Sequence, residues 1–146
     1  MDELAAALKI CQANTFFMYF RSHAYHHNVE GPEFAQYHEF FNDLYDELWN
    51  AVDPIAEHIR AIDKYAPFSI EDMFNAKTFS EDTNVISSTS QMFSNLIDAN
   101  NVTIDSLNKA FDLATYAKKQ GMCNFLADRL DIHAKHGWQL RSLSKG

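Results

Sequence analysis

Four side chains of the kind that bind metal ions follow one another in the first half of the chain. They are two histidines, His26 and His38, and two carboxylates, Asp53 and Glu57. Imidazole nitrogens combined with carboxylate oxygens suit iron(II), or another borderline divalent ion such as zinc, better than a metal that prefers thiolates. A further imidazole, His27, directly follows the first histidine. The pattern therefore indicates metal chemistry with iron(II) or another borderline divalent ion such as zinc, and His27 is a further imidazole beside the series.

The spacing divides this series into a histidine half and a carboxylate half. Asp53 and Glu57 are four positions apart, so on a helix they share one face and could hold one ion. His38 and Asp53 are fifteen positions apart, which on one helix is about 22 Å along the axis. One chain cannot bring both halves to the same ion. If the halves act together, two antiparallel copies of the helix must meet, and two-fold symmetry then creates two identical sites.

Each of these residues also has an ordinary interpretation. A histidine is more often a surface residue, or a core residue with satisfied hydrogen bonds, than a metal ligand. A carboxylate pair such as Asp53 and Glu57 is by itself usually part of a solvated helix face. Only the joint spacing favours the metal hypothesis over these alternatives.

The elements that position the ligands are predicted to be helices. The chain of 146 residues is 47% hydrophobic but contains only four glycines and three prolines, which leaves few turns and favours long helices. We expect one domain over residues 1–146. Apolar residues at three- and four-residue spacing predict long helices over about 2–27, 33–62, 88–119 and 122–143. Residues 63–86 lose this period, but a capping signal predicts a short helix over 69–75. The prediction is an all-α, up-down four-helix bundle whose long crossover, between the second and third long helices, carries the short helix.

Local signals refine these boundaries. Pro32 suits the first position of the second helix, and Ser69 with Asp72 resembles a capping box for the short helix. Pro54 removes a helical hydrogen bond, so we expect a kink beside Asp53. Gly121 is predicted to end the third long helix as its C-cap.

Charge and composition narrow the partners and the compartment. The net charge of −8 repels phosphate and attracts cations, and neither terminus is rich in lysine and arginine, so we do not expect DNA binding. Cys11 and Cys123 form no metal-binding or disulfide pattern, which is typical of a reducing compartment. We find no signal peptide and no apolar run long enough to span a membrane. A cytoplasmic protein with no membrane partner is the expectation.

The metal-binding segment resembles the Dps family of mini-ferritins, the DNA-binding proteins from starved cells. The family signature H-x-x-H-W-N-V-x-G-x-x-F-x-x-x-H corresponds here to residues His23 to His38, and its D-x-x-A-E-R corresponds to Asp53-Pro-Ile-Ala-Glu57-His58. The final segment, Phe125 to Arg141, is similar to the family's closing L-L-T-E-R-L-x-x-H-x-K-x-x-W-x-L-R. The resemblance extends over nearly the whole chain.

This resemblance implies a ferritin-like fold and a hollow shell of twelve subunits built from two-fold dimers. It implies that His26, His38, Asp53 and Glu57 are the ligands of ferroxidase sites shared between subunits. Two Fe(II) ions per site would be oxidised by hydrogen peroxide in preference to oxygen, and the ferric product would be stored as mineral. Such a protein protects against oxidative stress. The E-x-x-H pairs that larger ferritins place inside one bundle are absent from the sequence.

The sequence departs from the family pattern at several positions. His27 stands where the family usually has tryptophan; it could bind the second iron ion or merely form a hydrogen bond nearby, and both interpretations remain open. His58 replaces an arginine and so indicates a lost interface ion pair. Asn124 lies where the family has an acidic residue of the iron entry pore. Mineral nucleation and an ordinary solvated face are alternatives for four carboxylates near the histidine half, namely Glu39, Asp43, Asp46 and Glu47.

A second hypothesis comes from another functional class. The chain could be a non-enzymatic helical assembly protein that compacts DNA or buffers divalent metal ions, without ferroxidase activity. Pro54 beside the carboxylate half and His27 beside the histidine half leave this alternative open.

Overall fold

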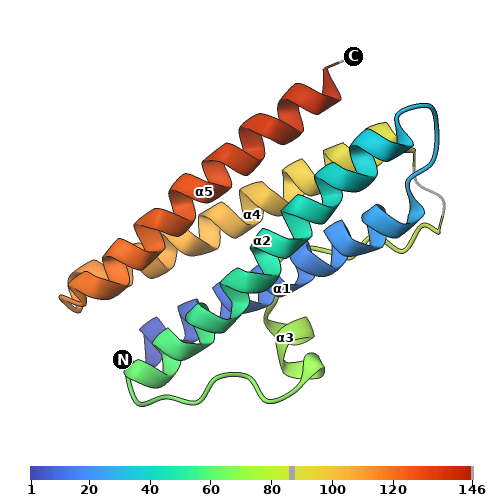
Figure 1. Ribbon diagram of the computed structural model, residues 1–146. Coiled ribbons are helices and arrows are strands. Elements are labelled where there is room, and N and C mark those ends of the chain that lie inside the picture. Colours follow the sequence, from blue (N-terminus) through green and yellow to red (C-terminus); the bar gives the residue numbers. More distant parts are fainter. Residues whose placement is uncertain (86–87, 146) are drawn as a thin grey trace.

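The computed structural model, which describes residues 1–85 and 88–145, contains four long helices with buried apolar faces and one short helix (Figure 1). The long helices are α1 (Asp2–Asn28), α2 (Phe34–Ala61), α4 (Thr89–Tyr116) and α5 (Gln120–Ser144), and the short helix is α3 (Ile70–Ala76). The described residues contain no strand. The predicted all-α fold, with a short helix in the second connection, is confirmed.

The connections fix the topology of the bundle. Short connections over residues 29–33 and 117–119 make α1 antiparallel to α2 and α4 antiparallel to α5. The segment between α2 and α4 crosses the whole length of the bundle and carries α3, so α2 and α4 run in the same direction (Figure 1). Asn14 of α1 pins this crossover: its side-chain nitrogen donates to the Thr78 hydroxyl at 3.0 Å, and its oxygen accepts from the Thr78 N–H at 2.9 Å. No helix of the described residues is both long and apolar enough to cross a membrane.

The apolar core consists of two clusters separated by polar side chains. One cluster surrounds the N-terminal half of α1 and includes Leu8, Ile59, Leu107 and Leu126. The other surrounds the C-terminal half of α1 and includes Met18, Phe41, Phe93 and Leu140. Buried polar residues lie along the same helices, among them Asn14, Thr15, Asn100, Thr103, Arg129 and His133. A buried polar group is costly unless it is hydrogen-bonded, so these residues restrict how the helices can be paired.

Some of the predicted helix faces and ends differ from the structure. The apolar spacing of α5 predicts that Leu126, His133, Trp138 and Leu140 are buried. Leu126, His133 and Leu140 are buried, but Trp138 is 58% exposed, and the polar residues Arg129 and His136 are buried as well. α4 ends at Tyr116, so Gly121 is not its C-cap and lies inside α5. Lys118 makes the turn instead, with a left-handed φ of 59°.

The hydrogen bonds at that turn explain how a lysine takes the position. The Lys118 N–H donates to the Thr115 carbonyl at 3.0 Å, and the Lys119 N–H donates to the Ala114 carbonyl at 2.9 Å. These two bonds form a Schellman motif, which satisfies the last carbonyls of α4 and offsets the strain of a non-glycine residue. The prediction that Gly121 ends this helix is therefore wrong, because Lys118 adopts the left-handed conformation instead.

Two further local predictions concern α2 and α3. The Ser69 hydroxyl accepts a hydrogen bond from the Asp72 N–H at 3.0 Å, so the predicted cap of the short helix is confirmed. α2 continues through Pro54 to Ala61, so the proline does not end the helix. The kink beside Asp53 stays a prediction.

Candidate metal centre

The histidine half of the predicted site is assembled within one chain. His26 lies in the last turn of α1, and the short connection returns the chain so that His38 of α2 faces it. The two imidazole rings stack with centroids 3.7 Å apart and an interplanar angle of 17°. The His26 Nδ1 is 2.7 Å from the His38 carbonyl oxygen, and the His38 Nδ1 is 2.7 Å from the His26 carbonyl oxygen. The two residues therefore hold each other in place.

These reciprocal hydrogen bonds determine the tautomer of both rings. A carbonyl oxygen only accepts hydrogen bonds, so each Nδ1 must carry a proton. In the neutral imidazole, the Nε2 of each ring then has a free lone pair, which is the form that binds a metal ion. Within the described part of the chain, neither Nε2 has a hydrogen-bond partner. Phe34 also stacks on His38 at 4.9 Å, which further restricts that ring.

Two more imidazoles lie beside this pair. The His23 ring stacks on Tyr45 with centroids 3.9 Å apart, and its Nδ1 is 3.0 Å from the Tyr19 hydroxyl. The His27 ring is exposed, with its centroid 4.6 Å from that of His23 and 5.4 Å from that of His26. The structure therefore places His27 next to the histidine half, and nearer to His23 than to His26.

The carboxylate half lies near the other end of α2 and faces outward. Asp53 and Glu57 are both exposed. Beside them is a surface hollow of about 550 Å³, lined by Gln12, Trp49, Asn50, Val52, Asp53 and Ala56. The Trp49 side chain is 53% exposed, and the buried Gln12 side-chain oxygen has no hydrogen-bond partner among the described residues. This end of the helix is thus an open, partly apolar surface.

The two halves do not meet within one chain. Over residues 1–85 and 88–145, no three His, Cys, Asp or Glu side chains converge on a point that could hold a metal ion. The structure brings His26 to His38, and it leaves Asp53 and Glu57 on a distant turn of α2. The structure thus keeps His38 and Asp53 apart along α2, as the helical rise predicts.

His58, next to the carboxylate half, packs within its own chain. Its ring lies against Phe125 of α5, with centroids 4.5 Å apart. Burial lowers the pKa of His58, and the nearby Glu57 carboxylate opposes this shift. Among the described residues, His58 forms no ion pair. Within its own chain it therefore does not make the ion pair that an arginine could make at this position.

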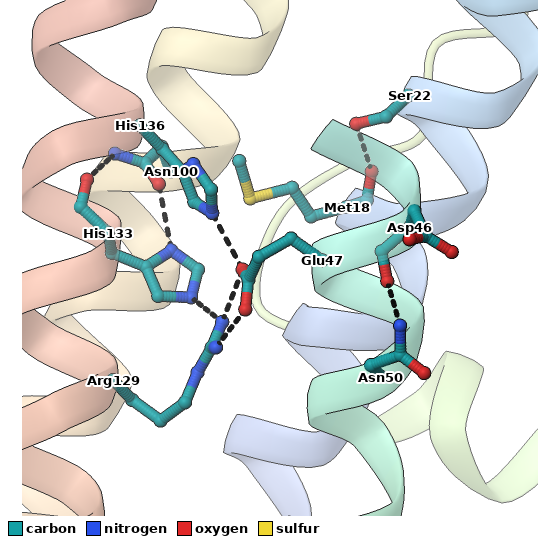
Figure 2. A network of polar contacts seen from close by, with 9 residues as sticks. All are labelled: Met18, Ser22, Asp46, Glu47, Asn50, Asn100, Arg129, His133 and His136. Carbon is teal, nitrogen blue, oxygen red and sulfur yellow. Dashed lines mark hydrogen bonds and ion pairs between the residues drawn. The ribbon is translucent and has the colours of Figure 1, made fainter. Parts of the chain in front are cut away.

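A second histidine cluster, which the sequence analysis did not identify, lies in the middle of the bundle (Figure 2). It joins Glu47 of α2 to α5 by two side chains. Arg129 donates to both Glu47 carboxylate oxygens, at 2.5 and 3.1 Å, and the His136 Nε2 lies 2.7 Å from one of them. Glu47 is a candidate for mineral nucleation from its sequence position, but its oxygens are already engaged by the Arg129 guanidinium and the His136 imidazole.

The same cluster continues from Arg129 to α4. Arg129 donates to the His133 Nε2 at 2.9 Å, so the His133 Nδ1 carries the proton and donates to the Asn100 side-chain oxygen at 2.8 Å. The Asn100 amide donates in turn to the His133 carbonyl at 2.9 Å. Neither ring nitrogen of His133 is left to bind a metal. In the sequence, this cluster could have been found from Arg129 and His133, two polar residues four positions apart on the apolar stripe of α5. Their contact with Asn100 of α4 is visible only in the structure.

Electrostatics agree with this closed arrangement. Burial raises the pKa of Glu47, but hydrogen bonds from His136 and Arg129, together with the arginine charge, outweigh it and lower the pKa to about 2. Burial, with the Arg129 charge, lowers the pKa of His133 well below its usual value. At neutral pH, the cluster therefore contains a carboxylate paired with an arginine and a neutral His133.

Comparison with known proteins identifies the family. The family model of the ferritin-like domain matches residues 5–145. The chain belongs to the ferritin-like family, in its Dps group. General stress protein 20U of Bacillus subtilis is 27% identical over 144 residues, which cover 97% of both chains. The DNA protection during starvation protein of Brevibacillus brevis is 28% identical over 144 residues, and the match covers 97% of this chain and 95% of that protein.

Solved structures agree with this Dps assignment. Dps from Thermosynechococcus elongatus has a TM-score of 0.94 at 25% identity, over 99% of this chain and 92% of its own. A Dps protein from Bacillus brevis has a TM-score of 0.90 at 26% identity, over 96% of this chain and 93% of its own. The ferritin-like fold of this Dps chain is thereby confirmed, together with the family resemblance of its sequence.

Proposed function

We propose that this Dps chain is a mini-ferritin that oxidises Fe(II) at di-iron sites shared by two subunits. One subunit would supply His26 and His38, and the other would supply Asp53 and Glu57. The observation that carries this proposal is the reciprocal hydrogen bonding of the two histidines, which leaves both Nε2 lone pairs free, and among the described residues no carboxylate joins them in a group that could hold a metal ion. A pair of pre-oriented imidazoles needs anionic ligands from elsewhere to hold a divalent ion.

A two-fold dimer can supply those ligands. Because the histidine half and the carboxylate half lie toward opposite ends of α2, two antiparallel copies of this helix align each half with its complement twice. The exposed Trp49 and the hollow beside Asp53 offer a partly apolar surface for such a contact. Dimers of this kind are the expected building blocks of a hollow shell of twelve subunits.

The expected reaction transfers two electrons from two Fe(II) ions to one hydrogen peroxide. The O–O bond breaks, two protons are taken up, and the products are two Fe(III) ions and two water molecules, with no hydroxyl radical released. Carboxylate ligands favour Fe(III) over Fe(II), and the neutral imidazoles complete the coordination. Zinc would occupy the same ligands without reacting, because it has no accessible redox step. We propose hydrogen peroxide as the preferred oxidant, ahead of oxygen.

The biological role would be storage of iron as ferric mineral and protection against oxidative stress. We place this activity in the cytoplasm, where free thiols such as those of Cys11 and Cys123 stay reduced. The net charge of −8 opposes binding to the phosphates of DNA, so the protection would not depend on DNA binding. We also retain His27 as an additional imidazole ligand for the second ion.

A complementation experiment tests both the activity and the sharing of the site. Two Fe(II) ions per chain are added without oxygen, then hydrogen peroxide is added, and ferric absorbance is followed. We expect rapid oxidation in the wild type and in Asp46→Asn, a control at another exposed carboxylate of α2, and loss of oxidation in His38→Ala and in Asp53→Ala. A mixed dimer of these last two variants would contain one site with all four native ligands, so co-assembly should restore part of the activity.

The contrary results are distinct. If the wild type does not oxidise iron rapidly, or if His38→Ala and Asp53→Ala oxidise it as fast as the wild type, the ferroxidase proposal fails. The non-enzymatic assembly protein, which compacts DNA or buffers metal ions, would then be the better hypothesis. If both variants are inactive and co-assembly restores nothing, the site is not shared in the way proposed.

A further inference from the structure

We propose that His23 and His27 form a second metal site, a two-imidazole chelate within one chain that binds a divalent transition ion such as Cu²⁺ or Zn²⁺. This site would be separate from the His26–His38 pair, and it is an alternative to the role of His27 as a ligand of the second iron ion, because one imidazole cannot serve both sites at once. Both ligands come from consecutive turns of α1, so the proposal does not rest on the shared ferroxidase site or on assembly into a shell.

The first support is the helical spacing of the two residues. His23 and His27 are four positions apart, so their side chains lie on one face of α1, one turn from each other. Their ring centroids are 4.6 Å apart, with an interplanar angle of 33°. Two nitrogens that bind one zinc ion at about 2.0–2.1 Å each are roughly 3.3 Å apart in a tetrahedral arrangement. The His27 side chain is exposed and forms no hydrogen bond among the described residues, so it can rotate about its own bonds to complete such a pair.

The second support is the way in which His23 is fixed. Its Nδ1 is hydrogen-bonded to the Tyr19 hydroxyl at 3.0 Å, and its ring stacks on Tyr45 with an angle of only 10°. Within the described residues, the His23 Nε2 has no hydrogen-bond partner. A hydrogen bond to the second ring nitrogen is the usual way in which proteins orient a metal-binding histidine. The Tyr19 hydroxyl is thus a positioning group, and His23 is the pre-oriented member of the pair.

The third support is the contrast in accessibility between the two rings. His23 is half-buried and held on two sides, whereas His27 is exposed and has no hydrogen-bond partner in the described part of the chain. An ion can therefore enter from solvent and be captured by His27 against the fixed Nε2 of His23. Among divalent first-row metal ions, a site that offers two imidazoles and water binds Cu²⁺ most strongly, and it binds both Zn²⁺ and Fe²⁺ less tightly than Cu²⁺. The negative charge of the chain also favours a cation.

The test titrates Cu²⁺ into the full-length protein and follows its electron paramagnetic resonance spectrum. The background is the His38→Ala/Asp53→Ala double variant, which disables the proposed shared site. We expect one Cu²⁺ per chain with a hyperfine pattern from two imidazole nitrogens. His23→Gln and His27→Gln should each weaken binding about tenfold or more, because loss even of a partner outside the coordination sphere costs 10–100-fold in affinity. Asn28→Ala, beside His27, is the matched control and should bind Cu²⁺ normally.

Further variants guard against a folding artefact. His27→Cys keeps a metal-binding side chain at the exposed position and should retain Zn²⁺ binding, whereas Tyr19→Phe should weaken Cu²⁺ binding without abolishing it. Absence of a bound Cu²⁺ with nitrogen hyperfine structure in the double variant overturns the proposal. So does binding that is insensitive to either His23→Gln or His27→Gln. Because the background lacks the shared site, these outcomes are independent of whether the protein oxidises iron.

Discussion

Two histidine clusters of this molecule differ in what happens to their nitrogen lone pairs. In the first cluster, His26 and His38 satisfy each other's Nδ1 through backbone carbonyls and leave both Nε2 atoms unbound among the described residues. In the second, both ring nitrogens of His133 are hydrogen-bonded, to Arg129 and to Asn100. The first cluster is suited to bind an ion from outside, while the second already contains its own cation.

The difference shows that histidines beside carboxylates do not by themselves indicate a metal site. The second cluster also combines imidazoles with a carboxylate, Glu47, but Arg129 provides the positive charge that a metal would otherwise supply. Its expected role is to hold α2, α4 and α5 in register. We therefore expect changes in the first cluster to affect iron chemistry, and changes in the second to affect stability.

The largest expected effect is on iron oxidation after loss of a first-cluster ligand. Replacing His38 with alanine should slow peroxide-driven oxidation by about 100-fold or more, since even partners outside the coordination sphere contribute 10–100-fold. The free energy of unfolding should fall by only about 1 kcal/mol, the usual net value of one hydrogen bond. Stopped-flow absorbance and urea unfolding measure the two quantities. If His38→Ala lost much stability but oxidised iron normally, the first cluster would be a structural cluster and not a site of iron chemistry.

The next largest effect is on stability, after loss of the arginine in the second cluster. Arg129→Met removes the cation that pairs with the Glu47 carboxylate, which then keeps only His136, and the donor to the His133 Nε2. It should cost about 3–5 kcal/mol of the free energy of unfolding. Urea unfolding followed by circular dichroism measures this cost, and the rate of iron oxidation per folded chain should be unchanged. Combining Arg129→Met with Glu47→Gln removes both charges and should recover part of the loss. If the single variant is as stable as the wild type, the second cluster does not hold the bundle together.

Acid should weaken the second cluster in two stages. His133 has a pKa below 6.5 in the folded protein, so the unfolded chain binds a proton first, and stability should decline as pH falls below 6.5. Glu47 has a folded pKa of about 2 against an ordinary value of 4.5, so its contribution is present above pH 4.5 and is lost between about 4.5 and 2. Urea midpoints at a series of pH values measure both stages. Glu47→Gln should flatten the lower stage only; an unchanged profile would contradict the assignment.

The smallest of these effects is expected at the edge of the second cluster. Asn100→Ala removes the acceptor of the His133 Nδ1–H and the donor to the His133 carbonyl. Leaving a buried donor unsatisfied costs about 1–3 kcal/mol, so the urea midpoint should fall without a change in iron oxidation. The exposed neighbour Asn101 provides the control, Asn101→Ala, which should have almost no effect. Equal losses in the two variants would mean that the hydrogen bonds to His133 are not responsible.

Much of the fold could be predicted from local patterns. The four long helices follow from apolar spacing, because burying an apolar stripe is the main source of helical stability in a protein. The short helix α3 follows from its cap, since Ser69 accepts a hydrogen bond from the Asp72 N–H. The end of α4 could not be predicted in this way. Glycine is the usual residue in a left-handed C-terminal turn, but Lys118 adopts that conformation here, with backbone hydrogen bonds to stabilise it.

The sequence by itself determined that His38 and the pair Asp53 and Glu57 cannot hold one ion within a single chain, because the helical rise separates them by a distance that no ion can span. Only the tertiary structure decided which nitrogens are free. The proton on each Nδ1 of the first cluster, the engagement of Glu47 by Arg129 across 82 positions of the chain, and the approach of His27 to His23 all depend on side-chain positions. Hydrogen bonds form between groups that packing brings within about 3 Å, and residue spacing along one helix cannot specify contacts with another helix.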